Sequence, residues 1–367
     1  MNKQKTLILH DTFLYKGGGE RLIMMMGKAL ESDIASGFFS PGSFDLRKEG
    51  FEGNMIPVSS EVFTKGLRHI KLKLAFLFHT HFIREYDTVL FSGDCISAVR
   101  NTTHKQKKVY YCHTPPRYLY DLKDRYRKKV PLLLRPVFDI ISALFRYWYE
   151  RDIEKIDIIL TNSKNTQKRI QSFLGKSSQV LYPPVDTTQF AYEGQGDYYL
   201  SYARLSDAKR VDKIVEAFCQ MPDKKLIVIY GENDPQREKV FALAQGYTNI
   251  IFKTLPGNVG LKEIVGNCIA SLYIPVDEDF GMTPVESMCA GKPVIGVDEG
   301  GLKESVIHNK TGILLKSDFS ISDICDAVQT LTPKKALEMR VDCESRAGEF
   351  GLDEFGERLK GFVYGKK

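Results

Sequence analysis

The amino-acid sequence predicts an α/β protein with two domains, each built on a mainly parallel β-sheet. Short runs of β-branched and aromatic residues alternate with helical stretches along the chain, which is the pattern of doubly wound sheets. The chain of 367 residues has room for two domains, since a domain typically holds about 100–200 residues. Two adjacent prolines in Tyr182-Pro183-Pro184-Val185-Asp186 interrupt the pattern, because proline stops a helix and keeps the preceding residue extended. We expect the domain boundary there.

The first half begins with a strand at Leu7–Leu9, the glycines Gly17-Gly18-Gly19, and a helix that opens at Glu20. This order starts a Rossmann-like domain that covers residues 1–186, with further strands expected at 88–91, 109–111, 156–160 and 179–181. A second Rossmann-like domain, residues 187–345, is expected to hold strands at 198–202, 225–230, 249–252, 270–274, 293–296 and 312–315. Two such domains facing each other leave a cleft at the carboxyl ends of their sheets, where these folds bind nucleotides.

Composition excludes several classes of protein. With 43% hydrophobic and 27% charged residues, the chain is neither disordered nor fibrous. No signal-peptide h-region follows the N-terminus, no apolar stretch approaches the roughly 18–20 residues of a bilayer span, and the seven cysteines include no Cys-x-x-Cys pair. We therefore expect a cytoplasmic protein. Residues 1–186 hold 30 Lys and Arg against 19 Asp and Glu, and residues 187–367 hold 22 against 27, so the first half suits an anionic partner.

The segment 277–301 predicts an anion site. The strand expected at 270–274 is followed by a turn at Gly281 and Thr283, and Pro284 suits the first turn of a helix. Free amides at that helix N-terminus, just past the end of a parallel strand, favour a phosphate. The carboxylates of Glu278 and Glu286 suit hydroxyl groups of a sugar or ribose. A solvated loop and an ordinary helix-terminal carboxylate are the alternative.

Arg204 and Lys209 lie where the strand at 198–202 gives way to a helix at about 209–220. Two cations at this spacing suit a diphosphate, and ordinary surface charges are the alternative. Other signatures fail. Ile170 stands where a P-loop ending in Gly175-Lys176-Ser177 needs glycine, and Leu22 stands where a dinucleotide fingerprint starting at Gly17 needs Gly or Ala. The acidic triplet 277–279 has no further ligand cluster, so no metal is expected.

Several of these segments together resemble family 4 of the retaining glycosyltransferases, which has the GT-B fold. The resemblance covers nearly the whole chain and lies in Arg204-x4-Lys209, Glu278-x7-Glu286, Gly291-Lys292-Pro293-Val294-Ile295, the linker 182–186 and Asn162-Ser163-Lys164-Asn165-Thr166. His10-Asp11, the glycine segment 17–20 and residues 111–121 further resemble bacterial O-antigen mannosyltransferases. In this family C-terminal helices return to the first domain, which implies the same for residues 346–367 and their amphipathic stretch Phe350–Val363.

The resemblance implies a role for each matching residue. Arg204 and Lys209 would hold the donor diphosphate, and amides of Phe280, Gly281, Met282 and Thr283 would close over sugar and phosphate. Glu286 would bind the ribose and Glu278 the donor sugar. From the first domain, Gly17, Gly18 and Gly19 would approach the diphosphate or acceptor, Arg117 would meet an acceptor phosphate, and His113 would reach the donor sugar. A buried structural histidine is the alternative for His113. The catalytic set would be His113, Arg204, Lys209 and Glu278.

The implied reaction transfers a hexose, with mannose favoured, from a nucleotide diphosphate sugar to a saccharide acceptor with retention of configuration. GDP-mannose is the favoured donor, and the acceptor is expected on a lipid diphosphate, in the synthesis of cell-surface polysaccharide or lipopolysaccharide. We expect no cofactor, no metal and no nucleic-acid partner. Two alternatives stay open: a sugar-nucleotide epimerase of the same fold, and a non-catalytic sugar-nucleotide-binding protein.

Two basic segments of the first half suit an anionic membrane surface. Residues 117–151 hold nine Lys and Arg against four Asp and Glu, interleaved with aliphatic residues and the single tryptophan, Trp148. Residues 65–84 have the same character. Such stretches can lie peripherally in an anionic membrane interface, here the inner face of the cell membrane. A core helix with a solvated basic face is equally compatible with the sequence.

Overall fold

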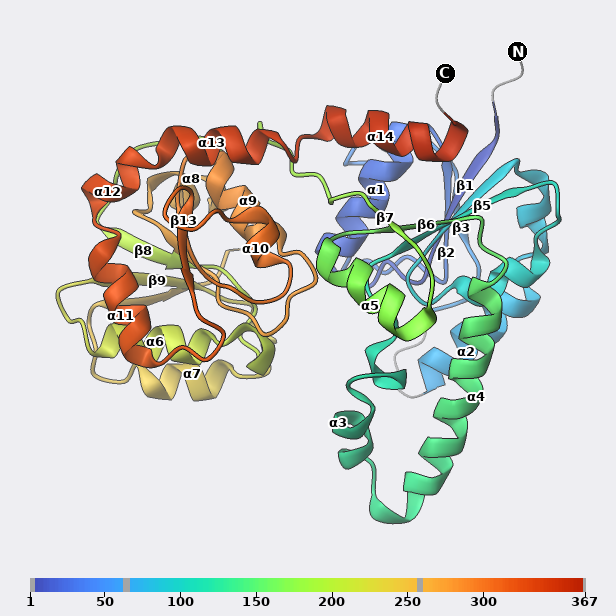
Figure 1. Ribbon diagram of the computed structural model, residues 1–367, viewed down its shortest axis with the longest axis horizontal. Helices are drawn as coiled ribbons and strands as arrows, with labels where there is room; N and C mark the ends of the chain where they lie inside the picture. Colours follow the sequence, from blue (N-terminus) through green and yellow to red (C-terminus); the bar gives the residue numbers. More distant parts are fainter. Residues whose placement is uncertain (1–3, 62–66, 256–259, 366–367) are drawn as a thin grey trace. The chain divides into compact units, whose positions relative to one another are not determined.

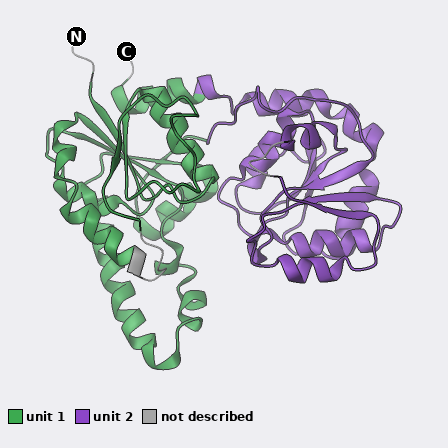
Figure 2. Cartoon of the chain, turned by 180° about the vertical axis from the view of Figure 1, so that it is seen from behind, with its two compact units in different colours: residues 1–182, 355–367 green, residues 183–354 purple. Residues whose placement is uncertain are grey.

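The computed structural model describes residues 4–61, 67–255 and 260–365. The chain forms two compact units: unit 1 holds residues 1–182 and 355–367, and unit 2 holds residues 183–354 (Figure 2). The division lies inside the proline segment 182–186. Residues 346–354, expected in the helix that returns to the first domain, belong to unit 2. Among the described residues, no helix combines the length and the apolar character that a membrane span requires.

The described part of unit 1 forms a seven-stranded sheet in which all neighbouring strands are parallel, in the order β3-β2-β1-β4-β5-β6-β7 (Figure 1). Its strands are β1 (Thr6–His10), β2 (Asp33–Ser36), β3 (Met55–Pro57), β4 (Thr88–Ser92), β5 (Lys107–Cys112), β6 (Ile158–Thr161) and β7 (Gln179–Val180). The sequence pattern does not predict β2 and β3, because both are short and neither contains a long apolar run.

Helices cover both faces of this sheet, which is why the middle residues of its central strands β1 and β4 are apolar. The helices of the described part of unit 1 are α1 (Gly18–Leu30), α2 (Leu67–Phe78), η1 (His81–Glu85), η2 (Ile96–Asn101), η3 (Arg117–Leu119), α3 (Lys123–Lys128), η4 (Leu132–Leu134), α4 (Arg135–Ile153), α5 (Lys164–Leu174) and α14 (Leu352–Tyr364). Side chains alternate between the two faces along a strand. Leu7 and Leu9 of β1 therefore join one buried cluster with Phe76 of α2, whereas Ile8 joins another with Ile23 of α1.

The C-terminal helix α14 packs on unit 1. Its residues Phe355, Leu359 and Val363 are buried in the same cluster as Ile8 and α1. The Tyr364 hydroxyl donates to the carbonyl of Leu30 at 3.1 Å. These contacts tie the end of the chain to the first unit.

The described part of unit 2 forms a six-stranded parallel sheet in the order β10-β9-β8-β11-β12-β13 (Figure 1). Its strands are β8 (Tyr198–Ser201), β9 (Lys225–Ile229), β10 (Ile250–Lys253), β11 (Ser271–Leu272), β12 (Val294–Val297) and β13 (Gly312–Leu315). Its helices are η5 (Asp207–Lys209), α6 (Val211–Cys219), α7 (Arg237–Leu243), α8 (Leu261–Asn267), α9 (Met282–Cys289), α10 (Leu302–Ser305), α11 (Ile321–Thr330), α12 (Pro333–Glu338) and α13 (Arg340–Gly348). Both units thus have the parallel α/β architecture that the sequence predicts.

Candidate active site

Two of the expected site residues in unit 2 meet in one polar cluster. Lys209 Nζ, at the end of η5, donates to Glu278 Oε2 at 2.5 Å and to the Tyr273 hydroxyl at 2.7 Å. The lysine and glutamate side chains are 22% and 23% exposed, so a bound substrate could still reach the pair. Burial, followed by the charge of Glu278, raises the pKa of Tyr273 well above its ordinary value. The sequence analysis did not single out Tyr273.

The second expected carboxylate, Glu286, is a buried residue of α9. Its charge and that of Glu278 both raise the pKa of Tyr273, after burial as the main cause. Glu286 also raises the pKa of Tyr202, again after burial. Both acidic residues therefore lie close enough to one tyrosine to act on it. Their spacing in the sequence alone does not establish this proximity.

A backbone turn at Gly281 places the start of α9 beside this cluster. Gly281 has a φ of +83°, and a Cβ there would lie 3.1 Å from atoms of both Tyr273 and Leu302. Only glycine adopts such a conformation without strain in so close a space. Tyr202 fixes α9 from the other side, because its hydroxyl contacts the Thr283 carbonyl at 2.8 Å and Ser287 Oγ at 2.9 Å.

The sequence predicts that the helix after Pro284 runs to Ala290 with Gly291 as its cap, and the observed end differs by one residue. The helix ends at Cys289 with Ala290 as its cap, and Gly291 follows in the left-handed region with a φ of +65°. Glycine at the residue after the cap is a common helix termination. The Phe280 side chain is buried, and its ring lies 5.4 Å from the Phe350 ring at an angle of 58°. The role expected of Phe280 concerns its backbone amide and stays a prediction.

A second pair of charged residues, missed at the sequence level, holds the loop that carries Glu278. Arg210 Nη2 donates to Glu299 Oε2 at 3.1 Å, and Glu299 Oε1 accepts from the Asp277 amide at 2.8 Å. The Gly301 amide donates to the Glu278 carbonyl at 2.7 Å. A Cβ at Gly300 would lie within 2.6 Å of the Glu278 backbone. The sequence signal that could have predicted this support of the Glu278 loop is the run Asp298-Glu299-Gly300-Gly301.

Arg204 occupies a different environment from Lys209. Its side chain is 68% exposed, and Nε lies 3.7 Å from Asp234 Oδ1. Asp234 is itself fixed by the backbone amides of Leu205 and Gly231, at 2.8 Å and 3.0 Å. Asp234 thus positions the guanidinium through Nε, and the rest of the group is accessible to a bound anion.

In unit 1, the expected residue His113 belongs to a hydrogen-bonded chain that the strand order creates. His10, Ser92 and His113 stand at the ends of, or just beyond, the neighbouring parallel strands β1, β4 and β5. Ser92 Oγ contacts His113 Nε2 at 2.8 Å and His10 Nδ1 at 3.2 Å, and His10 Nε2 lies 3.1 Å from Asp11 Oδ1. Sequence spacing did not identify His10 or Ser92 as partners of His113.

The surroundings of His113 keep its imidazole neutral. Burial, followed by repulsion from His10, lowers the pKa of His113 to about 4. Its carbonyl accepts from Asn162 Nδ2 at 2.8 Å, which gives the Asn162–Thr166 segment a local function. A neutral imidazole with one hydrogen-bonded nitrogen can still donate or accept one bond through the other.

The glycine loop begins α1, with Gly17 as its N-terminal cap residue. A Cβ at Gly19 would lie 4.0 Å from Cε1 of His113, so the glycine loop and His113 are neighbours. A Cβ at Gly17 would lie 2.5 Å from the Glu20 carboxylate. The structure thus brings the glycine loop and His113 together at the carboxyl ends of the unit 1 strands.

Arg117 is the expected residue with the weakest structural support. Its Nη2 donates to Asp121 Oδ2 at 2.5 Å, four residues further along the chain. The charge of Arg117 is therefore largely compensated locally. Its role toward an acceptor phosphate stays a prediction. Among the described residues, no group of three or more His, Cys, Asp or Glu side chains is arranged to hold a metal ion.

Comparison with known proteins defines the class. Residues 188–350 match the family model described as glycosyl transferases group 1. The fold resembles that of Anabaena Alr3699/HepE, solved with UDP and glucose, with a TM-score of 0.76 and 15% identity over 98% of this chain and 99% of that one. The fold also resembles that of WaaG, a glycosyltransferase involved in lipopolysaccharide biosynthesis, with a TM-score of 0.69 and 13% identity over 98% of this chain and 100% of that one. The chain is a glycosyltransferase with the GT-B fold.

Sequence relatives narrow the class further. The human alpha-1,3/1,6-mannosyltransferase ALG2 is 25% identical over 98% of this chain and 96% of its own length. A GDP-Man:Man(3)GlcNAc(2)-PP-Dol alpha-1,2-mannosyltransferase of Xenopus laevis is 25% identical over 60% of this chain and 51% of its own. These findings confirm the resemblance to family 4 of the retaining glycosyltransferases.

Proposed function

We propose that this glycosyltransferase moves mannose from GDP-mannose to a saccharide carried on a lipid diphosphate, with retention of configuration. The observation that carries the proposal is the contact of Lys209 with Glu278 and Tyr273 beside the Gly281 turn. A cation, a carboxylate and a helix start at the end of a parallel sheet suit a diphosphate sugar. The names of the mannosyltransferase relatives support the choice of sugar and the lipid-linked acceptor.

In the proposed reaction, the bond between the sugar C1 and the diphosphate oxygen breaks. The acceptor hydroxyl oxygen forms a new bond to C1 on the same face, and its proton passes to the departing phosphate oxygen. Arg204, Lys209 and the amides of residues 280–283 stabilise the negative charge that develops on the diphosphate. These groups make a metal ion unnecessary in our proposal, and no other cofactor is invoked.

The remaining residues bind and orient the substrates. Glu278 accepts hydrogen bonds from donor-sugar hydroxyls, and Glu286 from the ribose. We assign to the neutral His113 one hydrogen bond to a sugar hydroxyl, since its Nε2 already contacts Ser92. The glycines 17–19 allow close backbone approach of a substrate, and Arg117 is assigned to an acceptor phosphate once it is released from Asp121.

The proposed location is the cytoplasmic side of a membrane, where a lipid-linked acceptor is accessible. The excess of cations in residues 1–186 supports peripheral attachment to anionic lipid. The product would serve the synthesis of cell-surface polysaccharide or lipopolysaccharide. No nucleic-acid partner is proposed.

The test is transfer itself. Purified protein is incubated with GDP-mannose, UDP-glucose or UDP-N-acetylglucosamine and a short-chain alkyl diphosphate saccharide, and the product is analysed by mass spectrometry and NMR. We expect an α-linked mannose from GDP-mannose, with activity that survives excess EDTA. Donor converted to an isomer without acceptor would favour the epimerase, and donor binding without any turnover would favour a non-catalytic protein. Activity lost in EDTA and restored by magnesium or manganese would overturn metal independence.

A further inference from the structure

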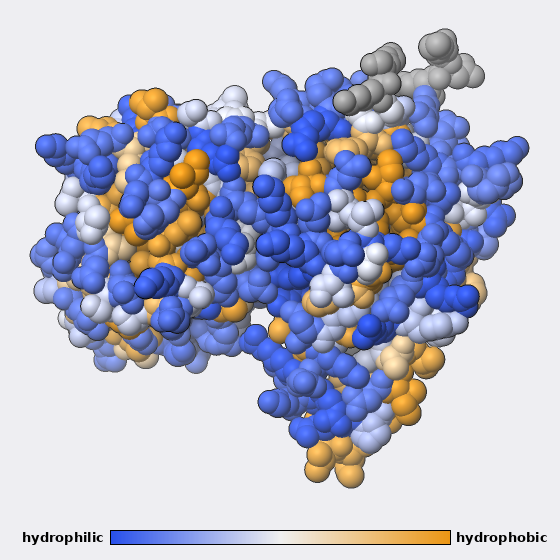
Figure 3. Space-filling view, viewed as in Figure 1, coloured by the Kyte–Doolittle hydropathy of each residue, from blue (hydrophilic) through white to orange (hydrophobic). Residues whose placement is uncertain are grey.

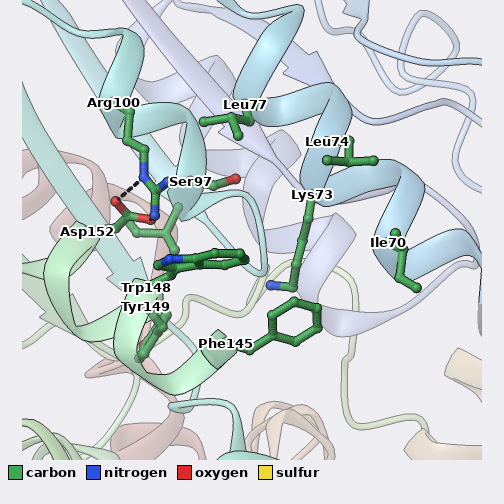
Figure 4. Close-up of a pocket in the computed structure, with 11 residues that line it drawn as sticks. Ile70, Lys73, Leu74, Leu77, Ser97, Arg100, Phe145, Trp148, Tyr149 and Asp152 are labelled. Carbon is green, nitrogen blue, oxygen red and sulfur yellow. Dashed lines mark hydrogen bonds and ion pairs between the residues drawn. The ribbon is translucent and has the colours of Figure 1, made fainter. Parts of the chain in front are cut away.

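Unit 1 contains a largely apolar pocket formed by elements that the candidate active site does not use. It lies between α2, η2 and α4 and has a volume of about 280 Å³. Leu74, Leu77, Phe145 and Trp148 supply much of its wall, and Figure 4 shows their side chains around one space. This volume is close to the lower end of ligand sites, which span about 300–1,000 Å³.

Each charged residue that lines the pocket has a partner of opposite charge, either in the lining or, for Lys73, just outside it. Arg100 donates to both carboxylate oxygens of Asp152, at 2.7 Å and 3.0 Å. Lys73 Nζ donates to Asp94 Oδ1 at 2.6 Å and also lies 5.3 Å from the centre of the Phe145 ring. Because these charges cancel locally, the pocket suits an uncharged apolar chain better than an ion.

The helices that border the pocket carry exposed apolar stripes. On α4 the stripe consists of Val137, Ile140, Leu144 and Trp148, which recur every three or four residues and are 45–63% exposed. On α2 it consists of Ile70, Leu74 and Phe78, with 48–59% exposed. A helix in a globular domain normally buries such a stripe. Both helices also bury one face in the core, through Phe76 of α2 and Tyr149 of α4. The alternative of a core helix with a solvated basic face is therefore correct for that face but does not account for the exposed apolar stripes.

Residues 123–153, which form α3, η4 and α4, project from unit 1 (Figure 1). The tip of this projection, around residues 125–134, combines exposed leucines with exposed cations. Leu132, Leu133 and Leu134 are 72%, 90% and 54% exposed, and Figure 3 shows hydrophobic side chains gathered at this tip. Nearby Arg125, Lys128 and Lys129 are exposed, and none of the three forms an ion pair with another described residue. Apolar side chains next to free cations match an anionic lipid interface.

We propose that this pocket binds one acyl chain of an anionic membrane phospholipid, while the stripes of α2 and α4 lie in the membrane interface. The inference deepens, and rests on, the membrane association included in the proposed function. The apolar, charge-compensated pocket takes the chain, and the cations at the tip meet the headgroups. A bilayer is the occupant that satisfies both features at once.

The single tryptophan makes the test direct, because Trp148 lines the pocket. The full chain is mixed with vesicles of phosphatidylglycerol whose acyl chains carry bromine, which quenches tryptophan on contact. Bound protein is measured in parallel by co-sedimentation. The informative variant is Ser97→Ile: Ser97 lines the pocket, and its buried hydroxyl has no hydrogen-bond partner in the described structure. The substitution therefore fills space without removing a polar contact. Ser178→Ile is the matched control, since Ser178 also has a buried, unpartnered hydroxyl but lies outside the pocket.

Trp148 also belongs to the interfacial stripe of α4, so every vesicle-bound variant should show some quenching. The pocket is reported by the additional quenching that we expect of wild type and Ser178→Ile over Ser97→Ile. In vesicle-free solution, octyl phosphate should change Trp148 emission at concentrations about 15-fold lower than hexyl phosphate, since each buried methylene contributes about fourfold in affinity. Equal quenching of the two serine variants would overturn the pocket while leaving membrane attachment intact. Vesicle binding without any quenching would overturn both the pocket and the interfacial placement of the α4 stripe. Failure to bind vesicles by an enzyme active on soluble acceptor would overturn both membrane proposals but not the transferase function. A change in Trp148 emission with polyprenyl phosphate, and none with phosphatidylglycerol that lacks bromine, would also overturn the inference.

Discussion

Replacing Lys209 by alanine tests the donor site most directly. The substitution removes the cation that lies 2.5 Å from Glu278 and 2.7 Å from the Tyr273 hydroxyl. A hydrogen bond to a charged group contributes about 1.5–3 kcal/mol. If Lys209 acts on the developing diphosphate charge, kcat/KM should fall by about 10- to 150-fold.

The effect on folding should be small by comparison. The Lys209 and Glu278 side chains are partly exposed, and an exposed ion pair usually contributes about 0.2–1 kcal/mol to stability. For a unit of this size that corresponds to a decrease in Tm of about 4 °C or less. Mannose transfer and thermal unfolding are therefore measured on the same preparation.

Lys213→Ala is the matched control. Lys213 lies in α6, and its ammonium group sits 4.8 Å from the centre of the Phe319 ring, outside the proposed site. It should retain wild-type kcat/KM. A Lys209→Ala enzyme within twofold of wild type, or one that loses activity only because it unfolds, would refute the assignment of Lys209 to the diphosphate.

Three further predictions follow from the structure. The lowered pKa of His113 means that the unfolded chain binds a proton more readily than the folded chain. The free energy of unfolding should therefore decrease as the pH falls from about 6.5 to about 4, by up to about 3 kcal/mol. Chemical denaturation should show a smaller decrease for His113→Gln, and the same pH dependence in both proteins would contradict the lowered pKa. Gly281→Ala should destabilise unit 2 by about 1–3 kcal/mol and should also weaken donor binding. The control Gly246→Ala has a similar φ but nothing within 4 Å of the added Cβ, so it should reduce stability without changing donor affinity. Equal donor affinities of the two variants would refute the role of the Gly281 turn. Exchange of Arg125, Lys128 and Lys129 for serine together should reduce vesicle binding by about 1 kcal/mol per cation, most clearly at low salt, and unchanged co-sedimentation would count against the tip.

Local patterns were sufficient to predict most of the architecture. Interior strands such as β1 and β12 are buried on both faces and therefore read as short apolar runs. The turn at Gly281 and the helix that follows were also predictable, because glycine and proline have specific backbone preferences. Strands β2 and β3 were not, since short strands near a sheet edge need few apolar residues.

The contacts of the site were less accessible to sequence reasoning. The sequence supplied His113, Lys209 and Glu278 as candidates but gave no partner for any of them. Arg117 illustrates the limit, since its ion pair with Asp121 reflects side-chain positions that residue spacing permits but does not require. The exposure of the α4 stripe was equally undetermined, because an amphipathic pattern fits both a buried and an interfacial helix.

The sequence by itself determined the fold class, the resemblance to glycosyltransferases and the residue types of the candidate site, since these depend on local propensity and on motifs within short segments. Only the tertiary structure decided which of those residues touch. Parallel strands that are distant in the chain end at the same sheet edge, and this brings His10 and Ser92 to His113. Lys209 meets Tyr273 and Glu278 for the same reason, because their loops follow the neighbouring strands β8 and β11.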